Sequence, residues 1–343
     1  MQILTQDGFV ESKNLKPHHH AWDSHGNPNP ILEIKTDTTQ LYKCMLKPHI
    51  SILLPLEQQI ELCKSSWKWQ PNCKTWRTMT IGDILNEDLV TKKWNRFYLR
   101  TNSEIKFPNK WPKIDPYLMG QMLGDGTMGR GAFQISTGDI ETIEKLTHIL
   151  GDDYVLSPRG NKGIDFRLKY NSNGNPLLNL FREYGVNLGS LEKYIPNDYL
   201  FGSIEDRIMI MRGLMDSDGT CRPNGTNYSF CTISTRLRDN MVFLGRSLGG
   251  TPSVGFKKPF YIKDGIKIRG QDAYNVSLKL PNHICPFDLS RKKERWEQKF
   301  KSKAKYTPYL IFESIAPIGI GYHTTLVTQN GSYIVEDFVN LIG

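Results

Sequence analysis

The sequence predicts an α+β protein in which two similar halves fill the middle of the chain and β-rich segments form both ends. Three observations predict this architecture. A glycine-containing helical stretch occurs twice, at Asp115–Gly126 and at Ile208–Gly219. A strand, a helix and a further strand follow each copy, which is the pattern of an internal repeat. Short alternating or apolar runs, broken by turn residues, fill both ends of the chain.

Each copy of the stretch predicts a helix that ends in an acid. Asp115 is a good N-cap, and Pro116 suits the first helical position. Ahead of the second copy, Ser203-Ile-Glu-Asp206 resembles a capping box. Gly126 and Gly219 are expected to end the helices in the left-handed conformation that glycine tolerates.

Small residues lie four positions apart on one face of each predicted helix. They are Gly120 and Gly124 in the first copy, and Gly213 and Ser217 in the second. Helices packed in parallel along such faces would bring Asp125 and Asp218 side by side. The carboxylates would repel each other at the negative ends of two helix dipoles. A divalent cation such as Mg²⁺ would remove this conflict, whereas two unrelated amphipathic helices would leave the matched acids unexplained.

Composition limits the class of protein. The chain has 343 residues, of which 38% are hydrophobic and 23% charged, and this suits a soluble protein of two domains. The sequence contains neither an apolar run of membrane-spanning length nor a signal peptide, so we expect a cytoplasmic, intracellular protein without a membrane partner. The net charge of +9 favours a polyanionic partner. None of the 6 cysteines forms a CxxC pair, and free thiols are expected at Cys44, Cys63, Cys73, Cys221, Cys231 and Cys285.

Residues 1–105 form the first predicted segment. Strands are expected at Gln2–Thr5, Gly8–Val10, Pro30–Ile34, Gln40–Met45, Ile50–Leu54 and Gln59–Cys63. A short helix is expected at Thr80–Leu85. Pro108, Trp111 and Pro112 then mark a boundary to the central domain.

Residues 106–290 form the central domain, with halves at about 106–200 and 201–290. Strands are expected at 131–137 and 165–170 in the first half, and at 227–235 and 273–280 in the second. Helices are expected at 139–150 and 237–248, each followed by glycine. The acids at 125 and 218 are separated by 93 positions, which sets the length of the repeat.

The strands alternate apolar and polar residues, so each sheet would turn its apolar face to the helices and leave a polar face open. Taken alone, such a face fits an ordinary solvated surface; beside the repeated motif, it favours contact with a DNA major groove. The predicted DNA-contacting residues are Arg130, Gln134, Ser136, Arg167, Lys169, Arg222, Asn227, Ser229, Lys257 and Lys258.

Residues 118–126 and 211–219 together resemble the paired motif of the LAGLIDADG homing endonucleases. This resemblance implies a monomer with two pseudo-symmetric αββαββα-like halves. It places the metal-binding acids at Asp125 and Asp218 and suggests that the carbonyls of Gly124 and Ser217 complete the coordination of two or three Mg²⁺ ions. The implied substrate is double-stranded DNA with a long, pseudo-palindromic or asymmetric target site, cut with short 3′ overhangs.

Two lysines are expected near the scissile phosphates on the same resemblance. Lys193, in Glu192-Lys-Tyr-Ile-Pro196, resembles the family block that carries the first. Lys279 is our choice for the second because of its position in the repeat, with Lys257 and Lys258 still possible. A surface lysine engaged in a salt bridge is the alternative reading for each.

Both chain ends resemble the splicing (Hint) domain of inteins. The matching segments are Ile3–Leu15, Ile60–Trp67, Trp76–Leu85, Ser314–Gly319 and Tyr333–Val339. Residues 291–305 are then a basic linker and residues 306–343 are the C-terminal part of this domain.

The sequence departs from the intein pattern at the positions that perform splicing. Met1-Gln2 replaces the first nucleophile, Ser65-Ser66 replaces the family's histidine, and the final His-Asn pair is missing. Because the acyl shift needs an attacking thiol or hydroxyl, we expect that splicing is lost and that the chain is a free-standing, intein-derived protein.

The sequence therefore predicts a site-specific, Mg-dependent double-stranded DNA endonuclease, a mobile genetic element of the homing type. Three alternatives stay open. The first is a nucleic-acid-binding protein of the same fold that does not cut, such as a maturase or regulator. The second is an intein still capable of protein processing. The third is a purely structural duplicated α/β domain, which leaves the paired acids unexplained.

Overall fold

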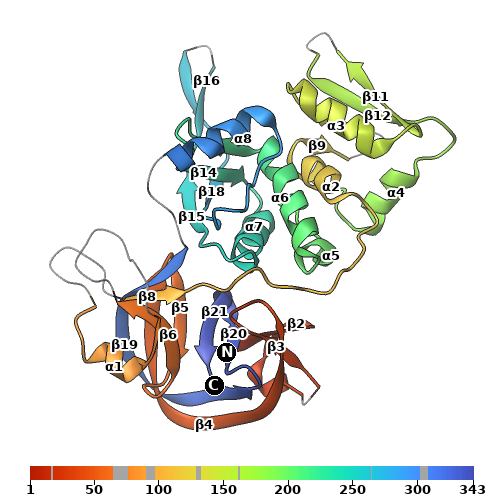
Figure 1. The fold of residues 1–343 in the computed structure, drawn as a ribbon. Coiled ribbons are helices and arrows are strands. Elements are labelled where there is room, and N and C mark those ends of the chain that lie inside the picture. Colours follow the sequence, from red (N-terminus) through yellow and green to blue (C-terminus); the bar gives the residue numbers. More distant parts are fainter. Residues whose placement is uncertain are drawn as a thin grey trace.

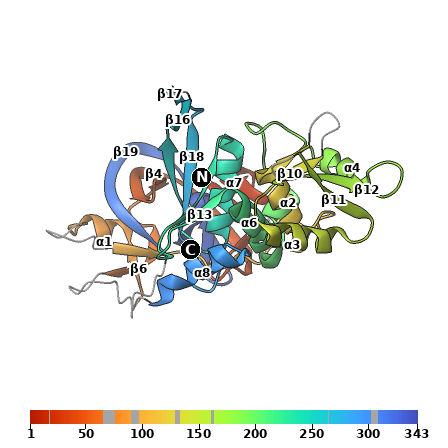
Figure 2. The same cartoon turned by 90° about the horizontal axis from the view of Figure 1, so that it is seen from above.

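The computed structural model describes residues 1–16, 18–64, 76–89, 97–128, 133–160, 163–263, 265–301 and 308–343. It has two parts, an all-β unit built from both chain ends and a central part of mixed α/β structure (Figure 1). The two termini lie close together in the all-β unit (Figures 1 and 2).

Both ends of the chain contribute strands to one 11-stranded sheet. Its strands are β1 (Gln2–Thr5), β2 (Gly8–Glu11), β3 (His20–Trp22), β4 (Pro28–Lys47), β5 (Ile50–Leu54), β6 (Gln59–Lys64), β7 (Arg77–Thr80), β8 (Phe97–Arg100), β19 (Tyr309–Thr328), β20 (Ser332–Val335) and β21 (Val339–Ile342). The order is β19-β8-β6-β21-β20-β1-β3-β4-β5, with β2 on β1 and β7 on β6. The long strands β4 and β19 pair antiparallel and form the curved ribbon at the bottom of Figure 1.

The core of the all-β unit joins residues that are far apart in the sequence. Ile3 and Leu99 from the first part pack in one buried cluster with Phe312 and Leu341 from the last part. The short helix expected at Thr80–Leu85 is present as α1 (Ile81–Leu85), which buries Ile81 and Ile84 in this core and begins at Thr80 with a complete capping box. Because the core needs both ends, neither end can bury its apolar face alone.

The cysteines differ in part from the expectation of free thiols. Cys44, Cys221, Cys231 and Cys285 are free. Cys63 is disulfide-bonded, so the expectation is wrong for this residue, and Cys73 lies outside the described residues. A disulfide depends on the distance between two Cα atoms in the fold, which CxxC spacing does not report.

The central part contains two halves with the same order of elements. The first has α2 (Pro116–Gly124), β9 (Gly126–Thr127), β10 (Gln134–Ser136), α3 (Ile140–Leu150), β11 (Tyr154–Arg159), β12 (Asp165–Tyr170) and α4 (Pro176–Glu183). After α5 (Asn197–Leu200), the second has α6 (Ile204–Ser217), β13 (Gly219–Cys221), β14 (Tyr228–Thr232), α7 (Thr235–Ser247), β15 (Ser253–Lys257), β18 (Ala273–Leu278) and α8 (Ser290–Glu297). The sheet orders β11-β12-β10-β9 and β15-β18-β14-β13 correspond strand for strand.

The second half carries a hairpin that the described part of the first half does not have. The strands β16 (Phe260–Lys263) and β17 (Ile266–Arg269) form a hairpin between β15 and β18 of the second half. This hairpin projects beyond the sheet (Figure 2).

The motif helices begin as predicted but end differently. The Asp115 carboxylate accepts a hydrogen bond from the Leu118 N–H at 3.0 Å, and the Ser203 hydroxyl accepts one from the Asp206 N–H at 3.1 Å. Gly126 and Gly219 do not adopt the left-handed conformation; they open β9 and β13 instead. A Cβ atom on Gly126 would lie 2.5 Å from the Met122 carbonyl oxygen, so glycine is needed here for close approach to the preceding turn.

The two motif helices pack with their backbones in contact, as the small residues predict. A Cβ atom on Gly120 would lie 2.4 Å from the Ile210 carbonyl oxygen, and one on Gly213 would lie 2.4 Å from that of Tyr117. Most other apolar residues of both helices pack in the core of the central part. The helix pair therefore fixes the relative position of the two halves (Figure 2).

The helix α8 belongs to the second half rather than to a linker. Lys292 and Trp296 are buried, and Trp296 is part of the central core. The domain boundary expected at residue 290 and the linker expected at 291–305 are therefore wrong for this helix. The basic composition of α8 does not reveal its buried face, which consists of residues four positions apart on the helix, Lys292 and Trp296.

An aromatic cluster joins the all-β unit to the central part. Phe9 and Phe338 of the all-β unit pack with ring centroids 5.4 Å apart. Phe107 and Phe243 extend this cluster to Phe201, at 5.2 and 4.9 Å. The side chain of Arg246 on α7 also forms an ion pair with Asp337.

Arg207 secures the segment that connects the two parts. Its guanidinium is fully buried and donates to the carbonyl oxygens of Ile105, Gly202 and Ser247. A buried cation that satisfies backbone acceptors on three segments holds them in a fixed arrangement. Across the described residues, no helix is long and apolar enough to span a membrane.

Candidate active site at the paired helix ends

The carboxylates of Asp125 and Asp218 occupy equivalent places. Each residue is the C-cap of its motif helix, with φ of −90° and ψ of 3° and 4°. The N–H of each donates to the carbonyl four residues earlier, at 3.0 Å in both helices. The carbonyl of each accepts from the central strand of its own sheet, Ser136 N–H at 3.2 Å and Cys231 N–H at 3.3 Å. Helix and sheet together therefore fix both acids.

The two acids form an electrostatically unfavourable pair. Asp218 is exposed and Asp125 is partly exposed, but the surrounding chain crowds both carboxylates. Burial, followed by the charge of Asp218, raises the pKa of Asp125 to about 6. Burial also raises the pKa of Asp218, while Lys193 and Lys292 act to lower it.

The donor set at the helix ends fits a hard divalent cation. Among the described hydrogen bonds, none reaches a carboxylate oxygen of Asp125 or Asp218. Accessible, unneutralised oxygen donors of this kind are the ligands that Mg²⁺ prefers. No group of three or more His, Cys, Asp or Glu ligands forms within the described ranges, so further ligands would be carbonyl or water oxygens. The Gly124 carbonyl retains a lone pair although it accepts a hydrogen bond from Lys193 at 2.9 Å.

A buried lysine lies under each motif. Lys193 is only 6% exposed, and its ammonium donates to the carbonyls of Met122, Gly124 and Gly126 at 3.4, 2.9 and 3.0 Å. Lys292 is 4% exposed and donates to the carbonyls of Met215, Asp216 and Gly219 at 2.8, 2.7 and 2.7 Å. Burial lowers the pKa of both lysines, that of Lys292 to about 8.

In the second half the buried lysine under the motif is Lys292, whereas Lys279, the predicted position, does not lie there. The Lys279 side chain is exposed just after β18, and Lys292 is the residue that matches Lys193. The positions 193 and 292 are 99 apart rather than the 93 of the acids, because the inserted β16–β17 hairpin lengthens the second half more than its shorter segment after β18 reduces it. Within a basic run, the one available signal was the apolar Trp296 four positions later, which marks the buried face of α8.

The predicted DNA-contacting residues differ in how far they are exposed to solvent. Ser136, Arg167, Lys169, Arg222, Asn227, Lys257 and Lys258 are exposed, and Gln134 is partly exposed. Ser229 is 8% exposed and bonds with Thr220 inside the sheet, so its predicted role in base contact does not fit. Arg130 lies outside the described residues.

Asp125 offers a stability test of the crowded pair. Because its folded pKa lies near 6, above the ordinary value of about 3.9, its ionisation opposes folding at neutral pH, and this penalty shrinks as the pH falls from about 6 to about 3.9. We expect metal-free Asp125→Asn to be more stable than the parent protein at about pH 7.5, with a smaller difference at about pH 5. Thermal unfolding in a chelator at both pH values measures this, and an equal difference at both would contradict it.

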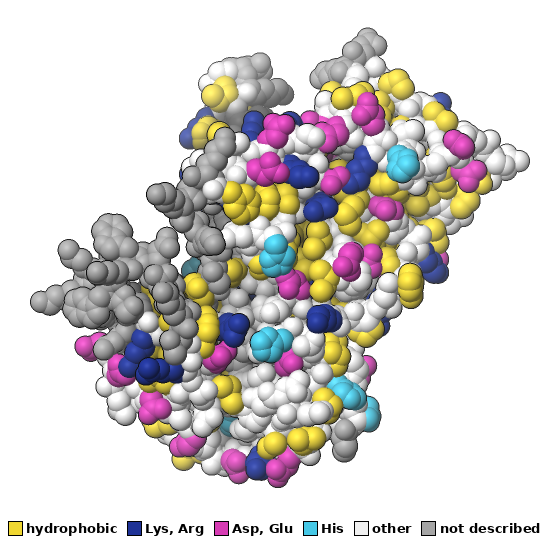
Figure 3. Space-filling model, viewed as in Figure 1, with side chains coloured by type: hydrophobic (Ala, Val, Ile, Leu, Met, Phe, Trp, Pro, Cys, Tyr) yellow, Lys and Arg dark blue, Asp and Glu magenta, His cyan; other side chains and the backbone are white. Residues whose placement is uncertain are grey.

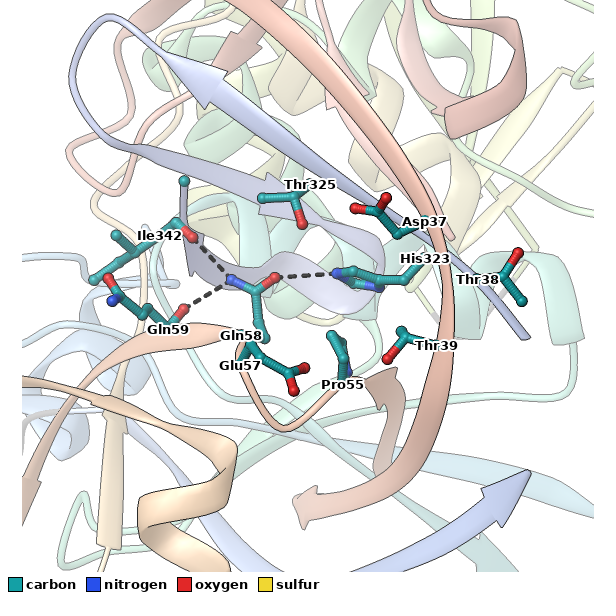
Figure 4. A pocket seen from close by; sticks show the side chains of 11 residues that line it. Asp37, Thr38, Thr39, Pro55, Glu57, Gln58, Gln59, His323, Thr325 and Ile342 are labelled. Carbon is teal, nitrogen blue, oxygen red and sulfur yellow. Dashed lines mark hydrogen bonds between the residues drawn. The ribbon is translucent and has the colours of Figure 1, made fainter. Parts of the chain in front are cut away.

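A second candidate site lies in the all-β unit. A cavity of about 550 Å³ is lined by Asp37, Thr38, Thr39, Pro55, Glu57, Gln58, Gln59, His323, Thr325, Ile342 and Gly343 (Figure 4). The Gln58 side-chain amide donates to the carbonyls of Gln59 and Ile342 at 2.9 and 2.8 Å. Its oxygen therefore faces His323 Nε2, at 3.1 Å, and this nitrogen must carry the proton.

The imidazole of His323 is consequently a neutral acceptor. Burial and the nearby N-terminal ammonium lower its pKa to about 4. With Nε2 protonated, Nδ1 keeps its lone pair. The hydroxyl groups among the described lining residues all belong to threonine, and none of these residues carries a thiol.

Comparisons with known proteins found similar proteins both by sequence and by structure. No family model matches this chain. The replicative DNA helicase DnaB of Mycobacterium intracellulare is 30% identical over 265 residues, which are 76% of this chain and 38% of that protein. The chain thus spans less than half the length of this curated relative.

Among solved structures, mesophilic variants of the homing endonuclease I-DmoI align at a TM-score of 0.34 and 12% identity, covering 57% of this chain and 98% of that chain. I-DmoI in complex with DNA and Ca aligns at a TM-score of 0.33 and 12% identity, covering 52% of this chain and 87% of that chain. Both scores are below the level at which a shared fold is inferred.

Proposed function

We propose that this chain is a site-specific DNA endonuclease of the LAGLIDADG type that hydrolyses one phosphodiester in each strand with the help of Mg²⁺. The observation that carries the proposal is the pair of helix-terminal acids, Asp125 and Asp218, each backed by a buried lysine. The two motifs in one chain support a monomeric enzyme acting on a long DNA site.

The acids and the lysines of the site would have different roles. Asp125 and Asp218, with the carbonyls of Gly124 and Ser217, would hold the two or three Mg²⁺ ions, which supply polarisation of the phosphate and a lowered pKa of bound water. Lys193 holds the carbonyl positions of the first motif, and Lys292 holds those of the second. The lysines also bring positive charge beneath a site that must accept a polyanion.

The open sheet faces would bind the DNA. Arg167, Lys169 and Gln134 lie on the first sheet, and Arg222 and Asn227 lie in the connection between β13 and β14 of the second. Basic and amide side chains on strands can contact phosphates and base edges in the major groove. The net charge of +9 supports the same partner.

The helicase match does not favour motor activity. The sequence contains no GxxxxGK[ST] loop, which is the element that cradles the phosphates of a nucleoside triphosphate. A non-cutting DNA- or RNA-binding protein remains the main alternative, and the two retained acids argue against it.

Selection from a randomised-site plasmid library tests the proposal. The full chain is incubated with the library in Mg²⁺ and, as a control, in a chelator. We expect linearisation at one long site in Mg²⁺ only. Retarded DNA in a gel without any cut plasmid would overturn the nuclease assignment and favour the non-cutting binder.

The buried lysines give a sharper prediction. Lys193→Met and Lys292→Met each keep the volume but remove the charge and the donors, and we expect each to lower the cleavage rate about a hundredfold. Lys279→Met is the matched control and should change the rate less than about twofold. Single-turnover cleavage of the selected site, with folding checked by circular dichroism, measures this. An equal loss in Lys279→Met would contradict the assignment of Lys292.

The all-β unit supports a further part of the proposal, that it descends from an intein splicing domain whose splicing is lost. The lining of the cavity at His323 offers no cysteine or serine nucleophile among the described residues. Residual protein processing is the second candidate function, favoured by the neutral His323 in this cavity. Expression between two flanking proteins, followed by mass measurement, separates the two: an unchanged fusion mass is expected, and a spliced or cleaved product would establish processing.

A further inference from the structure

The main-chain segment that carries each buried lysine is anchored outside its own half. Lys193 belongs to the first half, but its carbonyl accepts a hydrogen bond from the Ser234 hydroxyl at 2.7 Å. The N–H of Ile195 donates to the Asn240 side chain at 2.8 Å. The guanidinium of Arg236 lies 3.8 Å from the ring centroid of Tyr194. All these anchoring residues lie at the start of α7 or along it, in the second half.

The segment before Lys292 is anchored in the reverse direction. Ser290 donates to the Glu141 carboxylate through its N–H at 3.1 Å and through its hydroxyl at 2.8 Å. Arg291 forms a bidentate pair with Asp139, both bonds at 2.7 Å. The anchoring residues lie at the start of α3, in the first half. Figure 3 shows basic and acidic side chains intermingled on this face, between α8 and α3.

The two anchors use matching positions of equivalent helices. Asp139 and Ser234 are the N-cap residues of α3 and α7, and Glu141 and Arg236 follow two residues later. Four positions further along lie Lys145, which pairs with Asp288, and Asn240. Equivalent positions of α3 and α7 therefore anchor the two lysine segments. The groups that anchor the Lys292 segment are charged, whereas those that anchor the Lys193 segment form mostly neutral hydrogen bonds.

Asp216 adds a link that the first motif cannot make. Its buried carboxylate accepts from the N–H groups of Asp288 and Leu289, both at 3.1 Å, and from the Tyr117 hydroxyl of α2 at 3.0 Å. The first motif has Leu123 at the equivalent position. The turn that leads into α8 is thus also tied to the first motif helix.

We infer that each buried lysine is positioned by the half opposite to the motif it supports: α7 positions Lys193 and α3 positions Lys292. The anchoring residues act on the lysine segments and not on the substrate, so they are positioning residues. The effect expected on strand cleavage rests on the proposed endonuclease function, whereas the anchoring itself does not.

Hydrogen exchange of the full chain, read by NMR or mass spectrometry, tests the anchoring without DNA or metal. In Asn240→Ala we expect the Ile195 amide to exchange about fivefold faster, with the Ser290 amide unchanged. In Glu141→Ala we expect the reverse. Asp239→Ala and Glu144→Ala, which change neighbouring residues on the same helices, are the matched controls. Both amides responding to both variants, or to neither, would overturn the inference.

The effect of salt independently tests whether the Lys292 anchor is charged and the Lys193 anchor neutral. Because the anchor at Lys292 is charged, salt at about 1 M should weaken it by screening and accelerate exchange at Ser290. Exchange at Ile195, held by a neutral amide, should stay within about twofold under the same conditions. Equal sensitivity of the two amides to salt would contradict the charged and neutral assignments.

Strand-specific cleavage then tests the consequence. With each strand of the selected target labelled separately, Asn240→Ala should slow one strand and Glu141→Ala the other, by about tenfold or more. Equal slowing of both strands in both variants would overturn positioning by the opposite half. If the parent protein cuts no DNA, the endonuclease proposal fails by itself, and hydrogen exchange still decides the anchoring.

Discussion

Asp125→Asn and Asp218→Asn are each expected to lower double-strand cleavage about a thousandfold or more. Both acids occupy the same position, at the end of a motif helix, and the described residues supply no hydrogen-bond donor to either carboxylate. Replacing one carboxylate by an amide removes half of the anionic pair and one ligand of the proposed cation site. Linearisation of the selected plasmid, followed over time in Mg²⁺, measures the effect.

The same variants carry a readout that does not depend on cleavage. Binding of Mg²⁺ to the folded protein should raise its unfolding temperature, because a ligand that binds only the native state stabilises it. Asp125→Asn should lose this shift while remaining folded. Asp152→Asn, an exposed acid elsewhere on the first half, is the control and should keep both the shift and the cleavage. Full cleavage by Asp218→Asn would show that the acids do not form the active centre.

Gly120→Ala and Gly213→Ala are expected to destabilise the central part by about 3 kcal/mol or more each. A methyl group at either position would lie 2.4 Å from a backbone carbonyl oxygen of the facing helix. A flexible side chain could move aside, but a helix backbone in a packed core cannot do so without separating the helices. The separation would also displace Asp125 and Asp218 from each other.

Urea unfolding, followed by circular dichroism, measures this loss of stability. Gly138→Ala is the matched control, because a Cβ atom there meets nothing within 4 Å and the φ angle is not in the left-handed region. We expect Gly138→Ala to change the unfolding free energy by less than about 0.5 kcal/mol. If Gly120→Ala unfolded like the parent protein, the close packing of α2 and α6 would be wrong.

Much of the site could be predicted because its signals are local. The capping residues Asp115 and Ser203, the small faces of the motif helices and the final acids all lie within one helix each. Helix periodicity relates such residues to one another without knowledge of the rest of the chain. Lys193, which the structure places beneath the first motif, was predicted from its resemblance to a family block and not from its surroundings; its catalytic role stays a prediction.

Other features depend on contacts between distant segments. Lys292 could not be distinguished within a basic run until α8 was seen packed against the second motif. Left-handed helix ends were predicted at Gly126 and Gly219. In the structure these positions need glycine because the strand that starts there lies very close to the preceding helix turn. The burial of Ser229 and the disulfide of Cys63 likewise depend on neighbours that are not adjacent in sequence.

By itself the sequence determined the repeated helices, the position of both acids, the strand alternation and the positive charge. These follow from periodicities of a few residues and from composition. Only the tertiary structure decided which lysine backs the second acid, that α3 and α7 each anchor the lysine segment of the opposite half, and that both chain ends share one core. The physical reason is that burial and hydrogen bonding depend on contacts between segments far apart in the sequence. Patterns of a few residues carry no information about those contacts.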